Sequence, residues 1–123
     1  MLHPDRMPGS ERALVGAGKA GYLLRAAGRE SFFRTILGFE TEEALAAAVE
    51  RLAGELARVP ARFSRLNPAG RENWVALLEI AGPRRTARIF TVWERLADGR
   101  ASFVTARPLQ EGDALRFERW RPK

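Results

Sequence analysis

Charged and aromatic side chains alternate along the second half of the chain, where residue types that bind or cleave phosphodiesters come close together in sequence. An arginine guanidinium binds phosphate oxygens in a bidentate way, and an aromatic ring stacks on an unpaired base. This combination predicts a surface for RNA. Its candidate residues are Glu79, Arg88, Phe90, Phe103, Thr105 and Arg107.

Two kinds of chemistry are open to such a surface. In a binding surface, Phe90 and Phe103 stack on bases while Arg88 and Arg107 hold phosphates. In a nuclease, Glu79 or Glu94 acts as a base and the arginines stabilise the charge that develops on phosphorus. A purely structural alternative is a cross-strand ion pair between Glu79 and Arg88, with the aromatic rings covered by the first helices or by a second subunit.

Motifs for metal, nucleotide or covalent chemistry are missing from the sequence. The chain has no cysteine and one histidine, His3, which excludes thiolate metal sites, histidine clusters and a serine–histidine triad. The stretch from Gly16 to Lys19 lacks the glycine spacing and the hydroxyl residue of a phosphate-binding loop. We therefore expect no cofactor and no metal.

Strands must position the candidate residues, because the apolar period changes to two after Pro60. Asn67–Gly70, Gly82-Pro83 and Asp98-Gly99 are turn signals between apolar runs. The predicted strands are residues 62–66, 73–81, 86–95 and 101–107, with 115–120 as a further edge strand.

The turns also predict which residues face one another. A four-residue connection over 82–85 places Arg88 opposite Glu79, and the Asp98-Gly99 turn places Val92 opposite Thr105 or its diagonal neighbour. Alternation then sorts the strands onto two faces. One face is apolar and includes Trp74, Trp93 and Val104, and the other carries all six candidate residues.

The first half of the chain is predicted to be helical. We expect helices over 11–26, over Ser31–Leu37 with Ser31 as a cap and Gly38 as its end, and over 41–58 with Thr41 as its cap. Residues 1–10 are expected to form a flexible arm before a single domain over 11–123. The predicted fold is α+β, with N-terminal helices packed on one face of a four- or five-stranded antiparallel sheet.

The composition is strongly basic. The net charge is +6, and arginine supplies 19 of the 21 lysine and arginine residues. One interpretation is an anionic partner such as RNA, and the other is a GC-rich genome, which favours arginine codons. No apolar run approaches the roughly 18 residues of a membrane span, so we expect a cytoplasmic protein without a membrane partner.

An ordered set of short motifs resembles an uncharacterised bacterial domain family. The family pattern includes a "P-D-G-R-x-A-x-V-x-T-V-W" strand followed by "L-V-T-A-Y-P". The corresponding segments here, spread over about residues 19–109, are Gly21–Leu24, Phe32-Phe33, Leu37–Phe39, Gly82–Arg88, Thr91–Trp93 and Phe103–Pro108.

Members of that family occur alone and at the C-termini of adhesins and polymorphic toxins, and their last strand is similar to that of the barnase–EndoU–colicin–RelE ribonuclease toxins. The resemblance implies a module that binds or cleaves RNA. A basic "H-P-x-G-x-x-K-A" stretch of the family is shortened here to Arg25–Glu30, and the terminal Tyr-Pro is Arg107-Pro108. Arg25 and Arg29 can replace its charge but cannot transfer protons near neutral pH.

Two further hypotheses need no catalysis. The chain can be a non-catalytic module that binds a cognate protein, as in a toxin–antitoxin or phage-derived gene pair. It can also form a homodimer that buries the mixed face of the sheet against a second copy.

Overall fold

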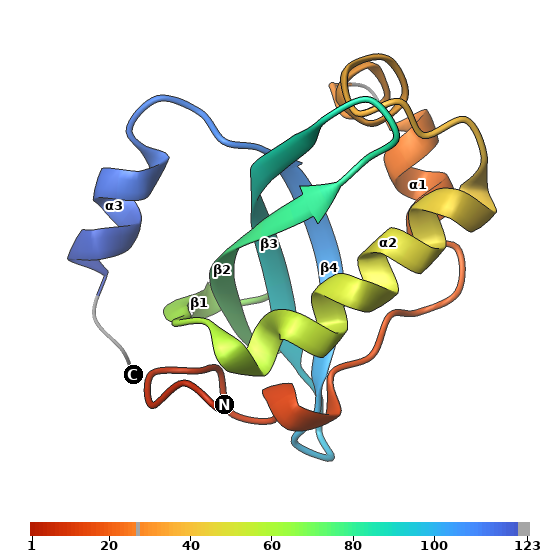
Figure 1. Ribbon diagram of the computed structural model, residues 1–123. Coiled ribbons are helices and arrows are strands. Elements are labelled where there is room, and N and C mark those ends of the chain that lie inside the picture. The colour runs from red at the N-terminus through yellow and green to blue at the C-terminus, as the bar shows by residue number, and fades with distance from the viewer. Residues whose placement is uncertain (27, 121–123) are drawn as a thin grey trace.

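A four-stranded antiparallel sheet and the helices around it make up the computed structural model, which describes residues 1–26 and 28–120 (Figure 1). The strands are β1 (Arg62–Leu66), β2 (Glu72–Ala81), β3 (Thr86–Arg95) and β4 (Ala101–Pro108), adjacent in that order. The helices are η1 (Ser10–Arg12), α1 (Lys19–Arg25), η2 (Ser31–Ile36), α2 (Glu42–Glu55), η3 (Leu56–Arg58) and α3 (Asp113–Arg119). The predicted α+β class and antiparallel sheet are confirmed.

Helix α2 carries the apolar stripe that closes the main core. Its first turn is capped by Thr41, whose Oγ1 accepts a hydrogen bond from the backbone N–H of Ala44 at 3.1 Å. Leu45, Val49 and Leu52 are almost fully buried, as their spacing predicts. They share a core with the apolar side chains of one sheet face, among them Trp74, Ala76, Leu78, Ile80, Ile89 and Trp93. We call this the core face and the opposite side the outer face.

The predicted helix over 11–26 is wrong in its first half. Ala13 is extended, Leu14 forms a parallel bridge with Ser102 at the edge of β4, and residues 17 and 18 form a turn. Helix α1 begins only after Gly18, whose φ of +84° is a conformation that glycine adopts readily. Glycines disfavour a helix in this stretch, and its backbone pairs with the sheet instead.

Residues 1–10, expected to form an arm, have contacts with the domain in the structure. The N–H of His3 donates to the carbonyl of Ala57 at 2.9 Å, and the N–H of Ala61 donates to the carbonyl of Asp5 at 3.0 Å. Met7 is completely buried and belongs to the main core. The segment therefore contributes a core side chain as well as backbone hydrogen bonds.

The short helix expected over 31–37 is present as η2, a π-helix rather than an α-helix. Its N-cap residue is Glu30, which makes no side-chain capping hydrogen bond, so the prediction of Ser31 as the cap is wrong. Gly38 ends it with a φ of +89°, as expected of a glycine after a helix.

Both predicted strand pairings are confirmed: Glu79 lies opposite Arg88, and Val92 lies opposite Thr105. The face assignment at β4 is wrong at one point. Trp93 pairs with Phe103 while Val92 pairs with Thr105, so Val104 is an extra residue in β4, a β-bulge. The bulge moves Phe103 to the core face, where the prediction had placed Val104.

The C-terminal segment is a helix, not the expected edge strand over 115–120. Helix α3 lies on the side of the sheet away from α2 (Figure 1). Its Phe117 joins a second, smaller core with Val75, Leu77 and Phe90 of the outer face. The sheet is thus covered by helices on both sides. In the described part of the chain, no helix is long and apolar enough to cross a membrane.

Candidate anion-binding surface

The outer face carries five of the six predicted site residues, but α3 and its neighbours occupy part of it. Glu79 and Arg88 are direct neighbours across β2 and β3, and both are exposed. Within the residues that the structure describes, the two side chains form no ion pair. No described carboxylate oxygen lies within 4.0 Å of the Arg88 guanidinium.

Phe90 does not offer a free ring to a base. It is 8% exposed. The guanidinium carbon of Arg107 lies 3.9 Å from its ring centroid, and Trp120 makes an edge contact with the same ring at 6.4 Å. The predicted role of Phe90 as a stacking platform conflicts with this arrangement. Its cover comes from Arg107 and the α3 region, and neither the first helices nor a second subunit supplies it.

Phe103 is also removed from the predicted surface, because the bulge at Val104 turns it inward. It is 1% exposed and contacts Trp93 edge to face at 5.3 Å. Its ring belongs to the main core. The sequence prediction for Phe103 therefore fails because strict alternation does not hold across a bulge.

Arg107 is held in place by Asp113 at the start of α3. Its two terminal nitrogens donate to the two carboxylate oxygens at 2.7 and 3.2 Å. The side chain of Asp113 is completely buried and also accepts a hydrogen bond from the N–H of Gln110 at 2.6 Å. These hydrogen bonds lower the pKa of Asp113 below its ordinary value, and the bond from Arg107 has the largest effect. Arg107 thus serves chiefly to attach α3 to the sheet.

Arg29 reaches the same face from the segment between α1 and η2. Its Nε donates to Oγ1 of Thr105 at 3.3 Å, across the free edge of β4. In the sequence analysis, Arg29 entered only as a residue that can replace the positive charge of the family's basic stretch, which is shortened here to Arg25–Glu30. Nothing in residue spacing places it beside Thr105, because the two are far apart in the chain.

The β2–β3 turn brings further arginines next to η2. Nη1 of Arg84 donates to the carbonyl of Thr35 at 3.2 Å, and the N–H of Arg84 donates to the carbonyl of Leu37 at 2.9 Å. Nε of Arg34 donates to the carbonyl of Leu24 at 3.3 Å. Two segments distant in sequence are thus joined by hydrogen bonds that involve arginines.

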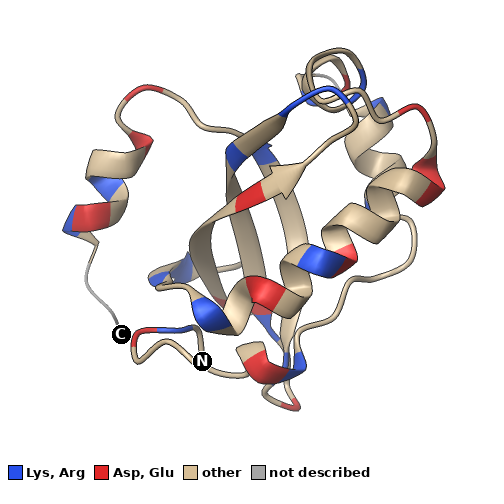
Figure 2. Cartoon of the chain, viewed as in Figure 1, with Lys and Arg blue, Asp and Glu red and all other residues tan. Residues whose placement is uncertain are grey.

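We call this surface the basic end, which comprises Arg29, Arg34, Arg84, Arg85 and Arg88. Figure 2 shows the basic residues of the β2–β3 turn beside those of the neighbouring η2 coil. Among the residues described, none of the five has a carboxylate oxygen within 4.0 Å. Arg29, Arg34 and Arg84 also donate hydrogen bonds to neutral oxygens, and a guanidinium that has no carboxylate partner can still bind phosphate oxygens.

The groups that the sequence offers for proton transfer, His3, Glu79 and Glu94, are not gathered at the basic end. His3 lies in the N-terminal segment, where its Nδ1 accepts from the N–H of Asp5. Glu94 is held by Arg71 at 3.1 Å and by Asn67, near the other end of β3. Glu79 is the one predicted base that adjoins an arginine of the surface, and acid–base cleavage also needs an acid for the leaving group.

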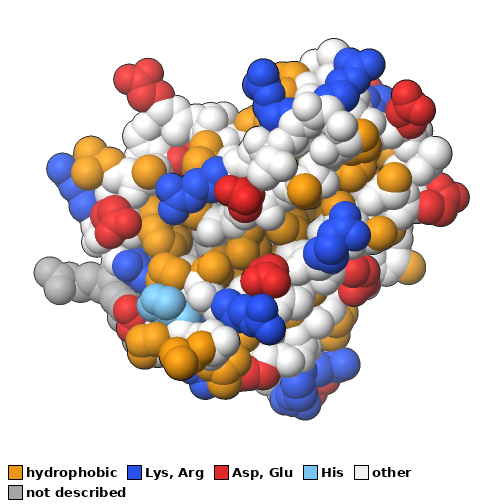
Figure 3. All heavy atoms as spheres, in the orientation of Figure 1, with side chains coloured by type: hydrophobic (Ala, Val, Ile, Leu, Met, Phe, Trp, Pro, Cys, Tyr) orange, Lys and Arg blue, Asp and Glu red, His pale blue; other side chains and the backbone are white. Residues whose placement is uncertain are grey.

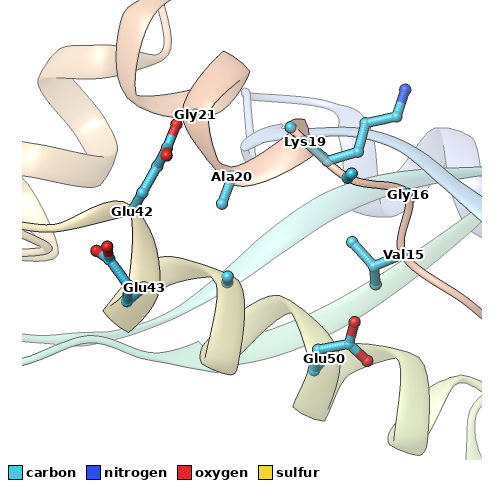
Figure 4. A pocket seen from close by; sticks show the side chains of 11 residues that line it. Val15, Gly16, Lys19, Ala20, Gly21, Glu42, Glu43 and Glu50 are labelled. Atoms are coloured by element: carbon cyan, nitrogen blue, oxygen red, sulfur yellow. The ribbon is translucent and has the colours of Figure 1, made fainter.

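A separate hollow of about 280 Å³ lies between α2 and the loop before α1 (Figure 4). Its wall includes Glu42, Glu43 and Glu50, and the Lys19 amine points away from it. This acidic lining repels phosphate, which agrees with the absence of a phosphate-loop motif around Gly16. Within the described chain, no cluster of three potential metal ligands occurs.

Comparisons with protein-family models, curated proteins and solved structures gave no match.

Proposed function

We propose that this protein binds RNA through its basic end, by contacts to phosphates, without cleaving it. The observation that carries the proposal is a group of five arginines, from η2, the segment before it, the β2–β3 turn and the start of β3, none of which has a described carboxylate oxygen within 4.0 Å. Residues 19–109 resemble an uncharacterised bacterial domain family whose last strand is similar to that of the ribonuclease-toxin group, and this resemblance favours RNA as the anion.

The kind of binding follows from the groups that are available. Phe90 and Phe103 are both buried, so bases find no stacking platform in them. Arginine contacts to phosphate contribute affinity that depends little on sequence and falls with salt. Binding at this surface is therefore expected to be electrostatic and weakly sequence-specific.

The test is fluorescence anisotropy with a labelled single-stranded RNA of about 12 nucleotides, at low and moderate salt. The double variant R85A/R88A removes two arginines of the basic end. The matched control R65A/R119A removes the same charge from two other exposed arginines, on β1 and α3. Arg65 pairs near the start of β2, whereas the basic end lies at the end of β2.

We expect R85A/R88A to weaken binding about tenfold or more and the control to weaken it about twofold or less, corresponding to roughly 1.4 and 0.4 kcal/mol. The RNA should remain intact on a denaturing gel after incubation. An equal loss in both variants would show that only net charge matters. Cleavage of the RNA would contradict the non-catalytic part of the proposal.

A further inference from the structure

The second half of β2 has a free edge. β1 pairs with β2 only from Glu72 to Val75, whereas β2 continues to Ala81. In the described chain, no other strand pairs with this edge of residues 76–81. We call this stretch the open edge.

Backbone groups at the open edge point outward at alternate positions. The N–H of Gly82 donates to the carbonyl of Arg85, which shows that even-numbered residues of β2 direct their backbone toward β3. The N–H of Asn67 donates to the carbonyl of Arg71, so odd-numbered residues direct theirs to the β1 side. Leu77, Glu79 and Ala81 therefore present unpaired N–H and C=O groups in the spacing that an extended chain matches.

Two hollows lie along the same edge. One, of about 380 Å³, is bordered by Val59, Leu77, Leu78 and Arg88, and the other, of about 190 Å³, by Ala48, Arg51, Leu52, Ile80 and Ala81. Glu55 and Glu79 line both hollows. Figure 3 shows hydrophobic side chains at the surface in the middle of this side of the molecule, bordered by acidic and basic ones.

We propose that an extended segment of a partner protein pairs with the open edge as an additional antiparallel strand, with a basic side chain opposite Glu79. The backbone groups select an extended chain of about six residues. A lysine or arginine opposite Glu79 is favoured as a cross-strand pair, because no described cation lies within 4.0 Å of Glu79, whereas Glu55 already pairs with Arg58 at 3.7 Å. Apolar neighbours of that residue fill the two hollows.

A second copy of this chain is a poor occupant of the open edge. β1 blocks pairing before residue 76, so a symmetric antiparallel pair is centred near Glu79. A pair centred on Glu79 sets the two Glu79 side chains directly opposite one another, and a pair centred on Leu78 sets them diagonally opposite on the same face. Like charges are unfavourable in both arrangements. The charge pattern therefore favours a different, basic segment.

The binding test uses a fluorescein-labelled, end-capped peptide of sequence Thr-Val-Val-Lys-Val-Val-Thr and its counterpart with a central glutamate. Both are palindromic, so chain direction does not affect the register. The intact protein is expected to bind the lysine peptide at least about fivefold more tightly than the glutamate peptide. In E79K, which changes an exposed residue, this preference should reverse.

A backbone variant tests the strand pairing itself. A81P removes an outward N–H, and proline is tolerated where a strand edge faces solvent. It should weaken the lysine peptide about tenfold, whereas A81T, which keeps the N–H, should bind like the wild type. Amide hydrogen exchange should slow at Leu77, Glu79 and Ala81 when the peptide is bound.

Three results would overturn the proposal. These are equal binding of both peptides, unchanged exchange at those three amides in the presence of the lysine peptide, and a dimer of the wild type that A81P dissociates. If A81P fails to fold, the reversed peptide preference expected of E79K still tests the proposal. A81P should still bind RNA as tightly as the wild type. Its loss of peptide binding is then independent of RNA binding at the basic end.

Discussion

Arg107 of β4 and Asp113 of α3 form a bidentate pair, with the guanidinium donating to both carboxylate oxygens at 2.7 and 3.2 Å. The same guanidinium lies over the ring of Phe90. The Arg107 side chain thus links β4 to α3 and also contacts an aromatic ring of β3. A residue that looks in sequence like a phosphate ligand is used to hold α3 on the sheet.

Replacing Asp113 by asparagine should destabilise the fold by about 2–3 kcal/mol, because a buried, charge-assisted pair is lost and Arg107 keeps its charge. Urea unfolding measures this change. The control is R116A, since Arg116 lies 3.9 Å from Asp113 and is largely exposed. Its effect should stay below about 0.5 kcal/mol. Equal effects of the two variants would contradict the assigned role of Arg107.

Acid should remove the contribution of Asp113. Because its pKa in the folded protein lies below the ordinary value of 3.8, the carboxylate stabilises the fold at pH values above 3.8. That stabilisation is lost as the pH falls below 3.8 through the folded pKa. The difference in unfolding free energy between wild type and D113N should therefore be constant near neutrality and shrink below about pH 4. A constant difference down to about pH 2.5 would rule out this linkage.

Phe103→Ala should cost about 3–5 kcal/mol in stability, because the ring is buried against Trp93. Val104→Ala, at the partly exposed bulge position, should cost less than about 1 kcal/mol. Thermal or urea unfolding distinguishes the two. If Phe103 were instead a stacking platform, its removal would lower RNA affinity and leave stability nearly unchanged.

Substitution by alanine should destabilise the protein at Gly38 and stabilise it at Gly54. At Gly38, φ is +89° and an added Cβ would lie 2.6 Å from Cγ of Arg84, so G38A should lose about 1–2 kcal/mol. At Gly54, within α2, a Cβ meets nothing within 4 Å, so G54A should gain up to about 1 kcal/mol. Urea midpoints of both variants check the predictions, and a stabilised G38A would contradict the close contact between η2 and the β2–β3 turn.

Salt dependence gives a quantitative check on the proposed RNA contacts. For single-stranded nucleic acid, each phosphate contact adds about 0.7 to the slope of log affinity against log salt. R85A/R88A should therefore lower the slope by about 1.4 if each arginine holds one phosphate. The R65A/R119A control should keep the wild-type slope. A slope unchanged in R85A/R88A would place the RNA elsewhere on the protein.

Local patterns were sufficient to determine several features of this protein. Thr41 and the apolar stripe after it define α2, since a side-chain cap and a helical period act within a few residues. The turn at Gly82-Pro83 determines that Glu79 faces Arg88. Short-range steric and hydrogen-bonding preferences suffice for these.

Tertiary structure alone decided the composition of the site. The Asp98-Gly99 turn sets a register in which Trp93 faces Phe103, and the bulge at Val104 then shifts it so that Val92 faces Thr105. The burial of Phe103 against Trp93 is a packing outcome. Residues after Pro108 form a helix because Asp113 and Phe117 find partners on the outer face. Side chains that are distant in sequence meet only when the core forms, so their neighbours cannot be read from spacing.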